Sequence, residues 1–203
     1  MCIRDSYKKL VDAAALKDKY YEIDERVEEI CKEAFKGCDK LEEIVMPKKL
    51  KKIDSEAFQG CTGLTKLTLP DSVMSIGNYA FYGCSGLAEL TLPNSVTSIE
   101  RMTFYGCSGL TELTLPDSVA SIGDGAFICC SDLSKITSLA EIPPVCGSGV
   151  FDRVNKTNCE LIVPIVSVTA YKQAEVWNEF SNIRGFSGVE VTVADTTRKI
   201  VVE

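Results

Sequence analysis

Hydrophobic residues recur along this chain with a fixed period. Five of the eight phenylalanines follow one another at intervals of 23 residues: Phe35, Phe58, Phe81, Phe104 and Phe127. A period of about 20 to 50 residues is the signature of a solenoid, in which each repeat forms one coil. Stacked coils share a continuous core that a single coil cannot form alone. The pattern therefore predicts a repeat solenoid, which offers an extended surface rather than one deep pocket.

The clearest repeat unit spans residues 64–86. In its first part, LTKLTL, Leu67 and Leu69 alternate with polar residues, which predicts a short strand with one buried face. Pro70 has no amide hydrogen to donate, so we expect the strand to end there. Apolar residues spaced by three and four then predict a tight turn around Phe81 that returns the chain to the core. The next unit, 87–109, matches this one at 15 of 23 positions.

The repeats predict the division of the chain. We expect about six 23-residue coils with short parallel strands over 18–164, in a right-handed stack, with Phe151 continuing the phenylalanine series one residue late. Residues 1–17 are a lead-in. Within it, residues 1–6 (MCIRDS) resemble the translation of a sequencing-library adapter and are interpreted as non-native.

The C-terminal part departs from the template. Over 165–187, an apolar residue at every third position, together with the only tryptophan, Trp177, predicts an amphipathic helix. Such a helix would cover the open core of the last coil, because a terminal repeat needs an atypical partner. We expect residues 188–203 to form a loose hairpin or the start of a truncated further domain.

The template resembles one family closely. The run L-x-L-P-x-S-V-x-S-I followed by A-F-x-G-C-S-G-L spans Leu67–Leu87 almost intact, and serine (Ser72, Ser95 and Ser118) replaces the asparagine usual at the ninth position of leucine-rich repeats. This pattern is similar to the BspA-type leucine-rich repeat of bacterial surface proteins, over roughly residues 18–183. The C-terminal stretch resembles the cap of such proteins from Bacteroidetes.

The resemblance implies a function that composition and spacing do not show. It implies a leucine-rich repeat solenoid that acts as a non-catalytic binding or adhesion module of a cell-surface or secreted protein, with a protein or glycoprotein ligand. Two alternatives stay open. The solenoid could be an accessory scaffold of a larger enzyme or carbohydrate-binding protein, or it could be an intracellular protein-interaction scaffold.

Composition narrows the function classes. The net charge of −7 and the absence of a basic stripe argue against nucleic-acid binding. No apolar run approaches the length of about 18 residues that a membrane span requires. The chain has no histidine, which removes the commonest general base, and it has no nucleophile or phosphate-binding motif. We therefore expect no enzyme, no cofactor, no metal and a monomeric chain.

Half of the ten cysteines follow the repeat, at Cys38, Cys61, Cys84, Cys107 and Cys130. In a stack held in register, their Cβ vectors run parallel, whereas a disulfide needs vectors that converge. We predict a buried column of free thiols that pack as small hydrophobic groups. Cys146 and Cys159 lie in the irregular C-terminal part and could form a pair.

One column of outward-facing residues is a candidate binding surface. We call it the threonine column, and it comprises Thr68, Thr91, Thr114 and Thr137, with Lys66, Glu89, Glu112 and Lys135 beside it. Threonine favours strands, so solubility and strand propensity explain the column without any function. The functional interpretation is a flat polar surface for a protein or glycan partner, on the face where solenoids bind.

Overall fold

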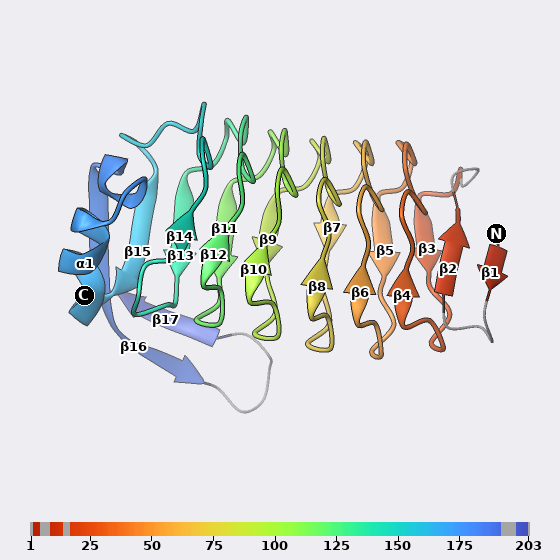
Figure 1. The fold of residues 1–203 in the computed structure, drawn as a ribbon, viewed down its shortest axis with the longest axis horizontal. Helices are drawn as coiled ribbons and strands as arrows, with labels where there is room; N and C mark the ends of the chain where they lie inside the picture. The colour runs from red at the N-terminus through yellow and green to blue at the C-terminus, as the bar shows by residue number, and fades with distance from the viewer. Residues whose placement is uncertain (1, 5–8, 14–16, 192–197, 203) are drawn as a thin grey trace.

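The computed structural model describes residues 2–4, 9–13, 17–191 and 198–202. The chain winds into a parallel-strand solenoid of about eight turns, roughly 23 residues apart. The two ends of the chain lie at opposite ends of this stack (Figure 1). The predicted leucine-rich repeat solenoid is therefore confirmed, with more turns than the six coils that the repeats predict.

Two sides of the solenoid are built from parallel strands. The first side, whose outward surface we call the strand face, contains β3 (Tyr20–Glu22), β5 (Glu43–Val45), β7 (Lys66–Leu67), β9 (Glu89–Thr91), β11 (Glu112–Leu115), β13 (Lys135–Ser138), β15 (Glu160–Pro164) and β16 (Asn182–Val191). The second side contains β2 (Lys9–Asp12), β4 (Glu29–Ile30), β6 (Lys52–Ile53), β8 (Ser75–Ile76), β10 (Ser98–Ile99), β12 (Ser121–Ile122) and β14 (Val145–Cys146). Antiparallel strands β1 (Cys2–Arg4) and β17 (Arg198–Val202) pair with β2 and β16.

The third side consists of tight turns, which we call the ridge. Each turn contains two residues in the left-handed backbone region. The first is Glu33, Glu56, Tyr79, Met102, Gly125 or Gly149, and the second is Gly37, Gly60, Gly83, Gly106, Cys129 or Arg153. Side chains rarely adopt this region because Cβ then approaches the following carbonyl oxygen. The repeated glycine after each phenylalanine is therefore explained, whereas the non-glycine positions carry backbone strain.

Phenylalanine rings form the centre of the core. Six rings, from Phe35 to Phe151, stack with centroids 4.8–5.5 Å apart and planes within 8° of parallel. All six side chains are fully buried. Phe151 joins the stack although it comes one residue late, because the extra residue lies in the turn before β14, where Val145 pairs with Ser121. The predicted phenylalanine series is confirmed.

The repeated cysteines form the buried column of free thiols that the sequence predicts. Each thiol also donates a hydrogen bond to a main-chain carbonyl of the preceding coil. The Cys61 Sγ lies 3.1 Å from the Phe35 oxygen, and the Cys107 Sγ lies 3.3 Å from the Phe81 oxygen. Cys146 and Cys159 are both free thiols in this structure. The column therefore contributes hydrogen bonds between coils as well as packing.

Serine at the ninth repeat position has a similar role. The Ser72 hydroxyl donates to the Leu50 carbonyl oxygen at 2.6 Å, and the Ser118 hydroxyl donates to the Val96 carbonyl oxygen at 2.7 Å. These bonds satisfy carbonyl groups in the turn that follows the strand. This explains how the template dispenses with the usual asparagine at that position.

The predicted C-terminal helix is present but is much shorter than residues 165–187. The structure has a 3-10 turn at Ile165–Ser167, the short helix α1 (Val168–Gln173) and a second 3-10 turn at Trp177–Glu179, and β16 begins at Asn182. Apolar residues at every third position match the 3.0-residue turn of a 3-10 helix and drift around an α-helix of 3.6 residues per turn. The spacing was therefore a signal for turns, not for a long helix.

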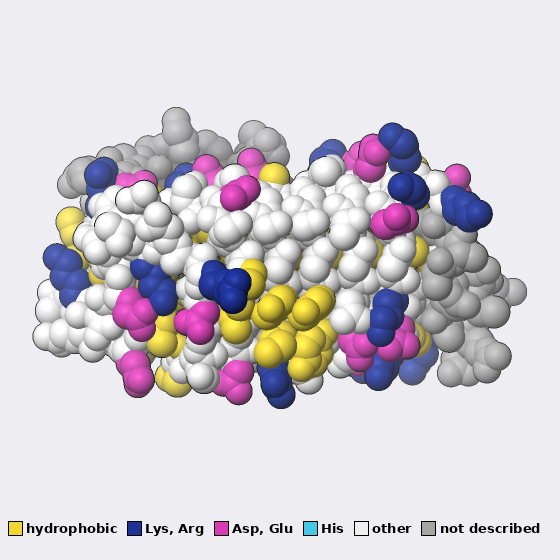
Figure 2. Space-filling view, turned by 90° about the horizontal axis from the view of Figure 1, so that it is seen from above, with side chains coloured by type: hydrophobic (Ala, Val, Ile, Leu, Met, Phe, Trp, Pro, Cys, Tyr) yellow, Lys and Arg dark blue, Asp and Glu magenta, His cyan; other side chains and the backbone are white. Residues whose placement is uncertain are grey.

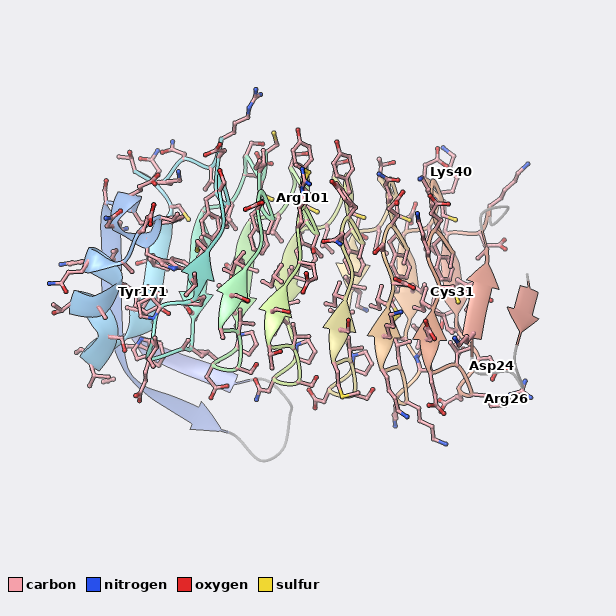
Figure 3. The ribbon with its side chains drawn as sticks, viewed as in Figure 1. Asp24, Arg26, Cys31, Lys40, Arg101 and Tyr171 are labelled. Carbon is pink, nitrogen blue, oxygen red and sulfur yellow. The ribbon has the colours of Figure 1, made fainter. Side chains whose placement is uncertain are left out.

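This segment nevertheless covers the end of the core. Trp177 is fully buried against Phe151, with ring centroids 5.4 Å apart, and its Nε1 donates to the Pro144 carbonyl oxygen at 2.8 Å. The Tyr171 hydroxyl, at the C-terminal end of the stack in Figure 3, donates to the Ala140 carbonyl oxygen and lies 2.7 Å from the Ser138 hydroxyl. Both polar aromatic tips are thus satisfied in an apolar environment.

The terminal segments also differ from expectation. Strand β2, within the predicted lead-in, pairs in parallel with β4 at the usual register, and Leu10 is fully buried. The stack of strands thus begins before residue 18. Over 188–203, β16 and β17 pair as antiparallel strands of a hairpin. The predicted adapter residues 1 and 5–6, like the hairpin turn at 192–197, lie outside the described residues.

Strand pairing is interrupted at one place, which we call the seam. Among the described strands, β7 does not pair with β9 and β8 does not pair with β10, although each pairs with its other neighbour. The ridge side of the same two coils stays bonded, with the Phe81 amide donating to the Thr103 carbonyl oxygen at 2.9 Å. The coils on either side of the seam are therefore joined by the ridge and the core rather than by strands.

Candidate interaction surface

The threonine column lies on the strand face, as its alternation with core leucines predicts. Thr68 and Thr91 are exposed, and Thr114 is half-buried. Thr137 is only 3% exposed, so the predicted column does not run the length of the solenoid. The open part of the column is centred on β7 and β9, the two strands that flank the seam.

The C-terminal end of the strand face is covered. Ile162 and Phe186 share the outward side with Thr137 and are 4% and 5% exposed. In Figure 1, β16 and β17 leave the end of the stack and turn back toward the neighbouring strands. Thr137 is therefore buried in this structure, whereas the sequence pattern predicts an exposed position.

A row of charged residues runs beside the threonines. The Lys66 Nζ lies 2.9 Å from a Glu43 carboxylate oxygen, and the Lys135 Nζ lies 3.1 Å from Glu112. The hydrogen bond that Lys66 donates to Glu43 raises the pKa of Lys66. Because these pairs are exposed, they contribute little to stability, about 0–1 kcal/mol each. The ion pairs neutralise Lys66 and Lys135 locally and hold these side chains in place on the strand face.

Glu89 differs from its neighbours in the row. It lies next to Glu112 in register, and it forms no ion pair with any residue that the structure describes. Like charges directly opposite each other on adjacent strands are unfavourable. An exposed carboxylate in this position is therefore free to accept a hydrogen bond from a partner.

A shallow groove adjoins this region. Its volume is about 230 Å³, and its lining residues are Glu43, Ile44, Val45, Met46, Lys66, Thr68 and Pro70. Val45 is 38% exposed, which places an apolar side chain next to Thr68 on the same face. The sequence analysis did not single out Val45. Val45 occupies the position in its own coil that Thr68 occupies in the next, so aligning the coils would have identified it.

Two other kinds of feature, a metal-binding group and a membrane-spanning helix, are absent from the described residues. These residues contain no group of histidine, cysteine or carboxylate side chains that could hold a metal ion. In the part of the chain that the structure describes, no helix has the length and apolar character to cross a membrane. The open strand face stays a candidate surface on the exposure of Thr68 and Thr91 alone.

The fold and the surface define a class of protein, a leucine-rich repeat solenoid. The particular family follows from its repeat: six copies of the BspA type leucine rich repeat region match residues 22–158. This match covers more than half of the chain, and the chain belongs to the BspA-type leucine-rich repeat family. The resemblance noted in the sequence is thus confirmed.

Solved structures support the same fold. A leucine-rich repeat protein of T. pallidum is 27% identical with a TM-score of 0.66, and the match covers 75% of this chain and 86% of that one. A leucine-rich repeat protein from Eubacterium ventriosum is 22% identical with a TM-score of 0.60, over 65% of this chain and 36% of that one. No curated protein matches the chain.

Proposed function

We propose that this solenoid is a non-catalytic protein-interaction module of a cell-surface or secreted protein and that it binds a protein or glycoprotein through the open strand face. One observation carries the proposal: Thr68 and Thr91 are exposed on adjacent coils beside the unpaired carboxylate of Glu89. Hydroxyl and carboxylate groups give hydrogen-bonding partners without a catalytic arrangement. The surface location rests on the likeness to bacterial surface proteins.

The face combines features that suit a reversible interface. Exposed hydroxyls alternate with charged side chains, and the groove beside β7 adds the apolar side chain of Val45. A partner that inserts an apolar group next to Val45 would displace water there, while its rim would bond to Thr68 and Thr91. The strand face is also the surface on which a solenoid presents equivalent residues from several coils to one ligand.

The test is a binding screen with a matched pair of variants. The protein is applied to immobilised mucins and serum glycoproteins, each with intact and with enzymatically removed glycans. The double variant Thr68→Lys, Thr91→Lys places two bulky charges on the open face. The control, Thr62→Lys, Thr97→Lys, makes the same change at exposed threonines outside the strand-face column.

We expect the strand-face variant to lose at least about tenfold in affinity for any glycoprotein captured by the parent, because buried charges at an interface are costly. The control should bind like the parent, and both variants should melt like it. Equal binding by both variants would remove the strand face from the interaction. Loss of binding after glycan removal would identify the sugar as the recognised part.

A further inference from the structure

A second surface lies on the ridge, away from the strand face. We call it the tyrosine ridge, and it comprises Tyr79, Tyr82, Met102, Tyr105 and Ile128. The rings of Tyr82 and Tyr105 stack with centroids 4.6 Å apart and planes within 2°, and Tyr79 lies 6.0 Å from Tyr82. Figure 2 shows hydrophobic side chains gathered in one patch on this face. All five residues are half-buried, so their outer edges reach solvent.

The chemistry of the ridge changes along the stack. In the first coils the same positions carry charged residues, and Lys36 makes ion pairs with Glu33 at 2.9 Å and with Glu56 at 2.7 Å. In the middle coils the positions become aromatic and aliphatic. The core template does not require this change, because these side chains point outward in every coil. The tyrosine ridge is therefore a local feature of two to three coils rather than part of the repeat.

Two residues of the tyrosine ridge occupy the left-handed backbone position that every coil repeats. Tyr79 and Met102 adopt left-handed φ angles of 59° and 50°, and the equivalent positions of the later coils are Gly125 and Gly149. Glycine would adopt this conformation without strain, so a large side chain here is held at a cost. Glu33 and Glu56 adopt the same conformation in earlier coils, with φ angles of 61° and 60°, so this strain belongs to the repeat and does not distinguish the tyrosine ridge.

Two arginines flank the patch without partners. The Arg101 carbonyl oxygen accepts the Tyr79 amide at 3.1 Å, and Arg101 lies on the ridge in Figure 3. Arg153 follows Asp152, whose carbonyl oxygen accepts the Cys129 amide at 3.0 Å. The hydrogen bond with Cys129 raises the pKa of Tyr105, and the charge of Arg153 opposes part of that increase. Neither guanidinium forms an ion pair with any described residue. Arg101 is also the only cationic residue between Leu67 and Ser134.

Acidic groups on the ridge do not neutralise these arginines. Asp124 follows Arg101 in the same column, but its Oδ1 accepts the Ser148 amide at 2.8 Å. Asp152 precedes Arg153 and lies beside Gly149. Neither carboxylate is within ion-pairing distance of a described cation. Both guanidinium groups therefore remain available to a carboxylate supplied from outside.

We propose that the tyrosine ridge, together with Arg101 and Arg153, binds an acidic peptide segment of another protein that carries an aromatic or aliphatic anchor side chain. Tyrosine and arginine are the residue types that most often dominate protein interfaces. Tyr82 and Tyr105 cover one face of each other's ring, and their partly exposed rings together with Met102 and Ile128 offer apolar surface to an anchor side chain. The guanidinium groups of Arg101 and Arg153 match carboxylates geometrically.

The experiment is a selection from a library of random dodecapeptides displayed on beads, with the whole chain as bait. Enriched peptides are then titrated against three proteins by fluorescence anisotropy. These are the parent, the ridge variant Arg101→Glu, Arg153→Glu, and a control variant Lys48→Glu, Lys49→Glu. The control makes the same change in net charge at two exposed lysines in the turn after β5, away from the ridge.

We expect enriched peptides to contain acidic residues around an aromatic or aliphatic one, and the ridge variant to bind them at least about tenfold more weakly than the control does. Peptides without acidic residues, or equal binding by both variants, would overturn the proposal, as would a selection that enriches nothing. Ridge-dependent binding to a glycan array, or a dimer of this chain abolished by Arg101→Glu, would replace the peptide with that partner. The strand-face variant Thr68→Lys, Thr91→Lys should bind the peptides normally, which separates this proposal from the proposed function.

Discussion

Removal of one ring from the phenylalanine stack tests the central claim that stacked coils share a single core. Phe104 is fully buried between Phe81 and Phe127, with centroids 5.4 Å away on both sides. Phe104→Ala removes about 1.5–3 kcal/mol of apolar burial. It also ends two ring contacts, each worth about 0.5–1.5 kcal/mol. Together with the cavity that remains, the expected loss is about 3–5 kcal/mol.

The assay is urea unfolding followed by far-UV circular dichroism and by the fluorescence of Trp177, the only tryptophan. With an m-value of about 2 kcal/mol/M, the loss lowers the midpoint by about 1.5–2.5 M. Met74→Ala is the control, because Met74 is 59% exposed in the neighbouring coil, and it should change the midpoint very little. Comparison of the two signals also tests whether the C-terminal cap unfolds with the rest.

A loss below about 1 kcal/mol for Phe104→Ala would refute the shared core. Such a result would mean that each coil is stabilised mainly by its own turn and by strand hydrogen bonds. A loss of the expected size with coincident signals would show that the stack transmits the defect to the cap. Repeat proteins couple neighbours in this way when interface terms dominate.

Three further predictions follow from hydrogen bonds, thiol burial and backbone strain. Because β7–β9 and β8–β10 are unpaired, the amides of Ala88 and Thr97 should exchange with deuterium faster than those of Thr111 and Ala120, which donate to carbonyls of the preceding coil. Equal protection would contradict the seam. Burial raises the pKa of Cys84 to about 12, so little of this thiol is ionised at pH 8. Cys129 is only partly buried, and mass spectrometry should therefore find Cys129 alkylated by iodoacetamide much faster than Cys84. Cys129 has a left-handed backbone at a position where four other coils have glycine, so Cys129→Gly should relieve strain. We expect the variant to be more stable by about 0.5–1 kcal/mol in thermal melts, and a lower melting temperature would argue against strain at this position.

The sequence was sufficient for the interior of this protein. Most positions that the 23-residue template assigns to the core are apolar in every coil, so one coil predicts the next, although Thr103 is buried where Ala80 and Ala126 stand in neighbouring coils. Phe151 and Trp177 could be placed because a stack requires a neighbour above each ring and a cover at its end. The hydrogen bonds of the cysteine and serine columns were missed, because their acceptors are main-chain atoms in the preceding coil.

The surface was less predictable because coverage depends on distant segments. Alternation correctly places Thr68, Thr91 and Thr137 outward, but it contains no information on whether another part of the chain lies above them. The seam is also invisible in the sequence, since coils 64–86 and 87–109 match at 15 of 23 positions. Spacing between strands is set by the whole stack, not by the residues of one coil.

The way in which outward columns vary suggests different uses for the two surfaces. A column that stays constant, such as Thr68, Thr91 and Thr114, presents the same group at successive coils, and its contacts can add up along an extended partner. A column that changes from Lys36 to Tyr82 within three coils presents one group at one place. Because the core constrains neither column, this difference cannot be a by-product of packing. The strand face therefore suits an extended or repetitive partner, while the tyrosine ridge suits a short segment recognised at a single position.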